Sequence, residues 1–256
     1  SVKTNSKNNS GKSGYMKHKN KSDRFDVVKR GFDKRSRADS GQSENTSGRL
    51  EATASVGADG STFAEKQKWK GGALLSPVPA VMVSCGTLEK PNILTVAWCG
   101  TVCTNPPKTY ISLRPERYSY PIIKERGCYV INLTTSSLVR AADFCGVRSG
   151  RDVDKFEAMN LHAAPALELD DTPTIAESPV SIECRVTDII PLGTHDMFLA
   201  DIVSVDVADE LIVDGALRLD RAGLAAYAHG EYFALGKKLG DFGFSVRKKK
   251  RIKRGK

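Results

Sequence analysis

The sequence predicts a mainly β domain, an antiparallel barrel or sandwich with peripheral helices. Short β-branched or alternating apolar segments recur through the middle of the 256-residue chain, with turn residues between them. No Gly-x-Gly-x-x-Gly turn, of the kind that opens a doubly wound nucleotide-binding sheet, follows a predicted strand. The composition is that of a globular chain, because 40% of the residues are hydrophobic and 27% are charged.

The first predicted strands are residues 80–85, 93–103 and 108–113. Proline and asparagine turns separate them, so three strands within about 35 residues predict an antiparallel meander. A helix is predicted over 116–126, because Pro115 precedes it and Gly127 ends it.

A strand over 128–133 and two short helices, around 138–145 and 153–159, are predicted next. The clearest strand is 181–190, where apolar residues alternate with polar ones such as Glu183. This period of two predicts one buried face and one solvent-exposed face. Residues 195–207 form a second long strand, and the two together predict a hairpin.

Charge divides the chain into three parts. Residues 1–65 hold 13 basic and 8 acidic side chains, and residues 66–246 hold 18 basic and 22 acidic ones. Residues 247–256 hold eight basic side chains and no acidic one. We therefore predict a disordered basic extension over 1–65, a folded domain over 66–246 and a basic tail over 247–256. The tail would attract phosphates, but a solvated charge run without stacking residues is the simpler interpretation.

Several classes of protein are disfavoured. No apolar run approaches the roughly 18 residues of a membrane span, and no export signal is evident, so we expect a cytoplasmic protein without a membrane partner. The six cysteines are then expected to be reduced thiols. Cys99 and Cys103 share a strand face, but packing in the core is a simpler interpretation than metal ligation.

Two segments carry candidate binding chemistry. Ser112-Leu-Arg-Pro-Glu-Arg-Tyr-Ser-Tyr120 places two guanidinium groups and two serine hydroxyls where a strand meets a helix, as in an anion pocket. A capped helix with surface arginines is the alternative. Asn92-Ile-Leu-Thr-Val-Ala-Trp98 sets polar groups and an indole three residues apart, so Trp98 either covers a flat ligand or fills the core.

Together these segments resemble the flavin reductase-like family, in its flavoredoxin branch. The resemblance continues through Pro106-Pro107, Asn132-Leu133, the Ser149–Phe156 segment, the Gly193–Phe198 corner and Tyr232-x-x-Leu-Gly236, and covers about residues 70–246. It implies an antiparallel FMN-binding split β-barrel that forms a homodimer. It also implies ten FMN-binding residues: Asn92, Thr95, Trp98, Arg114, Arg117, Ser119, Asn132, Lys155, His195 and Tyr232.

The resemblance further implies particular roles. Arg114, Arg117 and Ser119 would hold the flavin phosphate, and the segment from Asn92 to Trp98 would run along the ring. Lys155 or a protonated His195 near the ring would stabilise reduced flavin. No side chain need act as a nucleophile.

Three hypotheses follow. The first is an NAD(P)H-dependent FMN oxidoreductase that reduces free flavin, ferric chelates or a partner protein. The second is a flavoredoxin-type electron carrier that oxidises NAD(P)H poorly. The third is a nucleic-acid or ribosome-associated protein that acts through its basic ends.

Overall fold

The computed structural model describes residues 55–56, 62–63 and 66–247. The chain divides into two units, residues 1–69 and 70–256. In the first unit, strand β1 (Ser55–Val56) pairs antiparallel with β2 (Thr62–Phe63). Most of the predicted extension and tail lies outside the described residues.

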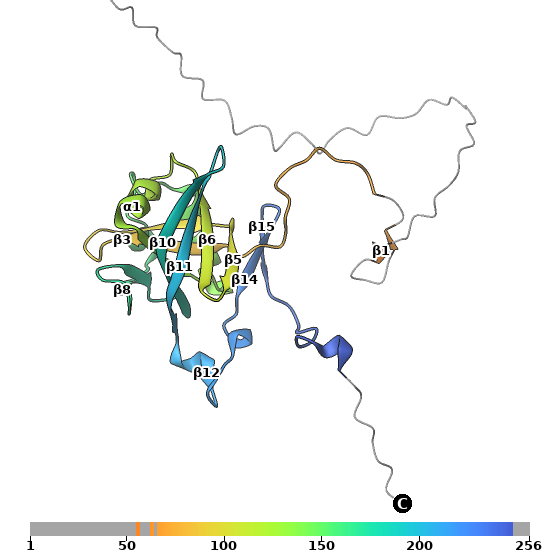
Figure 1. The fold of residues 1–256 in the computed structure, drawn as a ribbon. Helices are drawn as coiled ribbons and strands as arrows, with labels where there is room; N and C mark the ends of the chain where they lie inside the picture. The colour runs from red at the N-terminus through yellow and green to blue at the C-terminus, as the bar shows by residue number, and fades with distance from the viewer. Residues whose placement is uncertain (1–54, 57–61, 64–65, 248–256) are drawn as a thin grey trace, which may run out of the picture. The chain divides into compact units, whose positions relative to one another are not determined.

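A seven-stranded antiparallel sheet dominates the second unit (Figure 1). Its strand order is β4-β3-β7-β10-β11-β6-β5. The strands are β3 (Val81–Gly86), β4 (Pro91–Val96), β5 (Cys99–Thr104), β6 (Pro107–Leu113), β7 (Cys128–Asn132), β10 (Val180–Pro191) and β11 (Asp196–Val207). This arrangement confirms the predicted mainly β class.

The sheet encloses one apolar core, to which six of its seven strands contribute buried side chains. Val83, Leu94, Ile111, Ile131 and Phe198 all belong to this single cluster. Strands β4 and β6 are not neighbours in the strand order, yet both supply it, so the sheet must curl around the core. The alternation in each strand decides which side chains face inward.

The predicted meander is wrong, because β4 and β5 lie at opposite edges of the sheet. The predicted strand over 93–103 is broken at Ala97 and Trp98, and its two halves pair with β3 and β6 respectively. Periodicity along a chain specifies which face is buried but not which strand is the partner. Where the chain crosses between the edges, the Ser112 N–H donates to the Trp98 carbonyl at 2.9 Å.

Glu183 also differs from its prediction, because it is fully buried. The segment that contains β8 (Ala163–Pro165) and β9 (Pro173–Ile175) provides its partners. The Glu183 carboxylate accepts from the backbone N–H groups of residues 167–169 at 2.6 to 3.1 Å. Burial of an acidic side chain is tolerated here because backbone donors replace water.

Three helices and two small hairpins complete the unit. The helices are α1 (Ser119–Arg126), α2 (Val139–Val147) and α3 (Lys155–Met159), with 3-10 turns η1 (Ser136–Leu138), η2 (Asp209–Leu211), η3 (Leu219–Arg221) and η4 (Phe244–Val246). The hairpins are β12 (Ile212–Val213) with β13 (Ala216–Leu217), and β14 (Ala225–Ala228) with β15 (Glu231–Ala234). In the described part of the chain, every helix is too short or too polar to cross a bilayer.

Helices α2 and α3 pack against strands β3 and β4 and form a second apolar cluster there. Met82 and Ile93 contribute from the strands, and Ala142, Cys145 and Phe156 from the helices. Strand β4 is therefore held between the barrel core and these helices. Its outer edge has no strand partner in the sheet.

Candidate functional site

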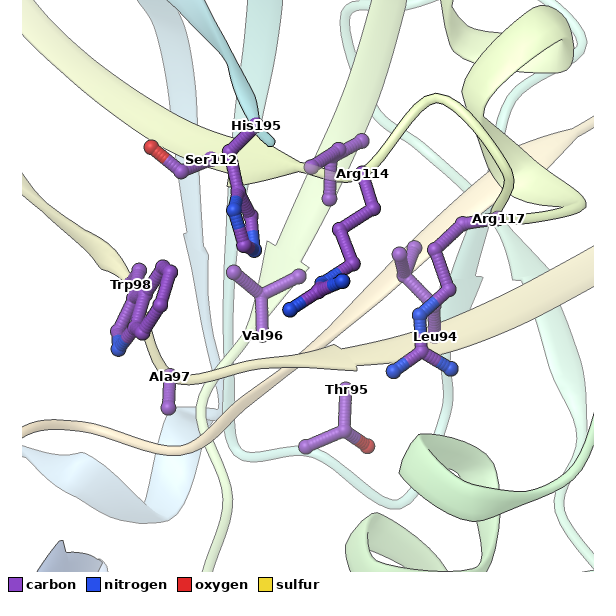
Figure 2. A pocket seen from close by; sticks show the side chains of 10 residues that line it. Leu94, Thr95, Val96, Ala97, Trp98, Ser112, Arg114, Arg117 and His195 are labelled. Carbon is purple, nitrogen blue, oxygen red and sulfur yellow. The ribbon is translucent and has the colours of Figure 1, made fainter. Parts of the chain in front are cut away.

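A cavity of about 270 Å³ opens where β4, β6, the start of β11 and the loop after β6 meet. Figure 2 shows its lining side chains, with Arg114 and Arg117 above the strand that carries Thr95 and Val96. The lining residues are Leu94, Thr95, Val96, Ala97, Trp98, Ser112, Leu113, Arg114, Arg117 and His195. The cavity thus brings together five of the ten predicted residues.

Arg114 and Arg117 reach the cavity from one tight turn. The N–H of Arg117 donates to the Arg114 carbonyl at 3.0 Å, and α1 begins only at Ser119. The predicted helix over 116–126 is therefore shorter, because its first residues form this turn. Arg117 Nη1 also donates to the carbonyl of Gly146, in the last turn of α2, at 3.0 Å. Two guanidinium groups on one side of a cavity make a site for an anion.

Trp98 and His195 form another part of the cavity wall. Their ring centroids are 4.5 Å apart with an interplanar angle of 47°, and Trp98 remains 46% exposed. Burial lowers the pKa of His195, and the nearby charges of Arg114 and Arg117 lower it further. The neutral imidazole is therefore favoured, and the expected cation at His195 is disfavoured. Trp98 presents a flat apolar surface to the cavity instead of filling the core.

The backbone of β4 offers hydrogen-bonding groups along its free edge. The Ile93 carbonyl accepts from Lys155 Nζ at 2.7 Å, so the backbone carbonyl of Ile93 points away from β3. In an antiparallel pair, residues two apart direct their N–H and C=O groups to the same side, so the backbone of Thr95 also faces outward. The Thr95 hydroxyl itself donates to the Ala142 carbonyl of α2, which leaves its backbone groups as the polar contribution to the cavity.

Lys155 is buried, with only 5% of its surface exposed. Its Nζ donates to the carbonyls of Ile93 at 2.7 Å and Cys145 at 2.9 Å. Burial lowers the pKa of Lys155, with a smaller contribution from the charge of Arg117. The ammonium group thus ties edge strand β4 to the carbonyl end of α2. Lys155 lines a separate cavity of about 580 Å³, not the one that contains the arginines.

Asn92 and Ser119 also lie outside the arginine cavity. Both are buried, and Asn92 Nδ2 donates to Ser119 Oγ at 2.6 Å. This bond ties the start of β4 to the start of α1. Gly150 packs so closely here that a Cβ at that position would lie 2.2 Å from Asn92 Oδ1. The two residues therefore support the site through the position of their elements.

Asn132 lies within the sheet, and its amide group is fully used there. Its Nδ2 donates to Met82 O at 3.0 Å and Ser84 Oγ at 2.9 Å, and its Oδ1 accepts from Ile175 N and Ser181 Oγ. These bonds join β3, β7, β9 and β10, so Asn132 is placed to hold the barrel together.

Tyr232 lies on hairpin strand β15, outside the arginine cavity. Its hydroxyl is 3.5 Å from Asp143 Oδ1, and its ring packs edge-on against Tyr227 at 5.2 Å. Burial, followed by the charge of Asp143, raises the pKa of Tyr232 to about 12. Within the described residues, no group of three or more His, Cys, Asp and Glu side chains could hold a metal ion.

Two supporting contacts were not predicted from the sequence. Gly146 supplies the carbonyl that receives Arg117, and the Tyr120 hydroxyl donates to Asp196 Oδ2 at 2.5 Å, next to His195. The second contact links α1 to β11 and so fixes the two sides of the cavity relative to each other. Its partners are 76 residues apart, which no local spacing could reveal.

Known proteins resemble this chain in sequence and in fold. Residues 74–236 match the model of the flavin reductase like domain. The flavoredoxin of Desulfovibrio vulgaris is 30% identical, with a TM-score of 0.66 over 72% of this chain and all of that chain. A Streptomyces viridifaciens NADPH-flavin oxidoreductase is 26% identical over 61% of this chain and 79% of its own length.

A protein of Shewanella frigidimarina with a split barrel domain shares the fold, with a TM-score of 0.58 at 23% identity over 64% of this chain and 85% of that chain. The predicted split barrel is thereby confirmed. The family model covers well over half of the chain. This chain belongs to the flavin reductase-like family.

Proposed function

We propose that the arginine cavity binds FMN and that the protein is an NAD(P)H-dependent FMN oxidoreductase. FMN combines a dianionic phosphate with a planar ring. The cavity combines two guanidinium groups with the Trp98 indole and with an apolar strip that consists of Leu94, Val96 and Ala97. Arg114 and Arg117 would hold the phosphate, and Trp98 with the outward backbone of Thr95 would contact the ring. This convergence of arginines and apolar strip is the observation that carries the proposal.

The chain's residues would bind and orient the cofactor and would not form a covalent bond with it. FMN, held by these residues, would supply the redox chemistry of hydride acceptance and electron transfer. His195, whose pKa is lowered by burial at the cavity wall, would act as a hydrogen-bonding group. Lys155 would act indirectly, by holding β4 against α2.

The identity of the electron donor is supported by relatives. The similar protein of Streptomyces viridifaciens is an NADPH-flavin oxidoreductase, and an Enterobacter cloacae relative, 22% identical over 49% of this chain and 73% of its own length, is an NADH-dependent FMN reductase. We infer that this chain uses NADH or NADPH and delivers electrons to free flavin, a ferric chelate or a partner protein.

Two measurements test the proposal. The first is the absorption spectrum of the purified protein with added FMN, where a bound flavin shows bands near about 375 and 450 nm that shift on binding. The second is steady-state oxidation of NADH and of NADPH with FMN present. Absence of FMN binding in fluorescence titration would refute the cofactor assignment, and binding without turnover would refute only the reductase activity.

A flavoredoxin-type electron carrier is the second candidate. It is favoured by the similarity to the D. vulgaris flavoredoxin, whose entire chain is matched. Such a carrier would bind FMN in the same cavity but would turn over poorly with both nicotinamide nucleotides. Rapid reduction of bound FMN by a protein donor, together with negligible NAD(P)H oxidation, would establish it.

We also propose that the protein is a homodimer. The resemblance to the family supports this, as do the large apolar side chains that remain exposed in the isolated chain. Sedimentation velocity of the full chain with and without FMN tests the proposal. A single monomeric species at about 50 μM would refute it.

A further inference from the structure

The C-terminal arm, residues 235–247, exposes an unusual density of apolar side chains. Leu239 is 93% exposed, Phe242 107% and Val246 83%, while Leu235 and Phe244 are exposed by 62% and 59%. Single exposed apolar residues are common on protein surfaces, but five within thirteen residues form a patch. Such patches mark sites of interaction with another molecule.

The arm has a defined local structure. Asp241 forms ion pairs with Lys238 at 2.5 Å and with Arg247 at 3.8 Å, and the Phe244 N–H donates to the Asp241 carbonyl at 2.9 Å. The Phe244 ring packs on Gly240, where an added Cβ would lie only 2.6 Å from a ring carbon. Phe242, Phe244 and Val246 are therefore displayed on a preformed turn, which lowers the entropy cost of docking.

The C-terminal end of the chain and the rest of its unit carry net charges of opposite sign. Residues 70–236 hold 14 basic and 21 acidic side chains, whereas residues 237–256 hold ten basic and one acidic. Opposite net charges favour the approach of the cationic end of one molecule to the domain of another.

One surface of the domain combines exposed apolar side chains with acidic ones. This surface, the acidic shelf, consists of residues 205–220 and contains η2, β12 and β13. Its exposed apolar residues are Val205, Ile212, Leu217 and Leu219, and its acidic residues are Asp206, Asp209, Glu210, Asp214 and Asp220. Its one basic residue, Arg218, is paired with Asp220 at 2.7 Å. The shelf thus matches the arm in apolar character and opposes it in charge.

We propose that the C-terminal arm of one copy docks on the acidic shelf of a second copy, and that the exchange is reciprocal. This inference rests on the homodimer included in the proposed function, and it names the surfaces that join the two chains. The arm and the shelf are both exposed in one chain, so the arm does not cover its own shelf. A twofold axis would let each arm bury the partner's shelf in the same way.

A polyanion is a less favourable binding partner for the arm than a second copy. RNA or an anionic bilayer would attract the cationic residues 247–256, but either would leave the apolar residues of the shelf exposed. A second copy covers both apolar patches in one contact and neutralises both charges. The observations therefore favour self-association.

Cysteine cross-linking in the full chain tests which molecule receives the arm. We expect Phe242→Cys combined with Ile212→Cys to give a covalent dimer on a non-reducing gel after mild oxidation. Phe242→Cys combined with Leu167→Cys is the matched control, because Leu167 is 79% exposed but lies outside the shelf. Only an intramolecular product, or as much dimer from the control, would overturn the proposal.

Charge reversal provides a second test that does not depend on oxidation. We expect Lys237→Glu with Lys238→Glu, and separately Asp209→Lys with Glu210→Lys, each to weaken the dimer about tenfold or more in sedimentation. An equimolar mixture of the two variants should recover the dimer, because the reversed arm then meets the reversed shelf and the unchanged arm meets the unchanged shelf. Failure of the mixture to recover would refute the pairing.

FMN titration of the same variants separates this inference from the proposed function. Variants that are monomeric yet still bind FMN support the docking model and leave the cofactor assignment intact. Wild-type protein that dimerises through the arm without binding FMN would refute only the cofactor assignment. If the protein bound RNA or anionic vesicles more tightly than it bound a second copy of itself at physiological salt, the docking model would be overturned.

Discussion

Removing the two cavity arginines should weaken the binding of FMN far more than that of riboflavin. Arg114 and Arg117 both line the cavity, and within the described residues the only hydrogen bond that either side chain makes is the one from Arg117 to the Gly146 carbonyl. A hydrogen bond with a charged partner contributes about 1.5 to 3 kcal/mol, so losing both groups costs about 3 to 6 kcal/mol. The double variant Arg114→Ala with Arg117→Ala should therefore raise the Kd for FMN about 10² to 10⁴-fold.

Quenching of flavin fluorescence at low and moderate salt measures this effect. Riboflavin has the same ring but no phosphate, so its affinity should change little in the double variant. Arg140→Ala is the control, since Arg140 is exposed on α2 and does not line the cavity. Equal losses of affinity for FMN and riboflavin would show that the arginines shape the ring site and do not bind the phosphate.

Three further predictions concern buried or titrating groups. Lys155→Met leaves two backbone carbonyls without their buried donor, so we expect it to lower the free energy of unfolding by about 3 kcal/mol, measured by urea denaturation. Arg114→Gln should raise the pKa of His195 in NMR titration, because the charge of Arg114 lowers it; an unchanged pKa would show that Arg114 does not contribute to the shift. Burial raises the pKa of Cys85 from 9.0 to about 11. The folded state therefore keeps the thiol while the unfolded chain loses its proton, so stability from this group is present below pH 9 and is lost as the pH rises toward 11. The loss is about 2 to 3 kcal/mol, and Cys85→Ala should make stability fall less steeply over that range; an identical slope would contradict the assignment.

The sequence predicted those parts of the fold that depend on local pattern. Alternation in residues 107–113 places Thr109, Ile111 and Leu113 in the barrel interior, as expected for a strand with one buried face. Glycine at position 127, with φ of 65°, ends α1 as predicted. Both features are determined within a few residues, so a single sequence contains the necessary information.

The features that local pattern missed depend on distant segments. Glu183 looked like a solvent-facing residue, and only the arrival of residues 167–169 makes its burial possible. The break at Ala97 and Trp98 depends on which strands pair at the two edges of the sheet. For the same reason, the family resemblance implied Asn132 as an FMN-binding residue, but its place in the hydrogen-bond network of the barrel could not be predicted.

Two cations at the carbonyl end of α2 connect this helix to the arginine cavity and to edge strand β4. Arg117 donates to Gly146 O and Lys155 donates to Cys145 O, so each compensates the partial negative charge at this helix end. Lys155 also holds Ile93, and Arg117 also lines the anion site. An anion that draws Arg117 away from Gly146 would therefore leave Lys155 as the remaining side-chain cation on the end of α2. The buried lysine that the family resemblance implied as a flavin contact is thus placed where it would keep edge strand β4 in position if the arginine engaged an anion.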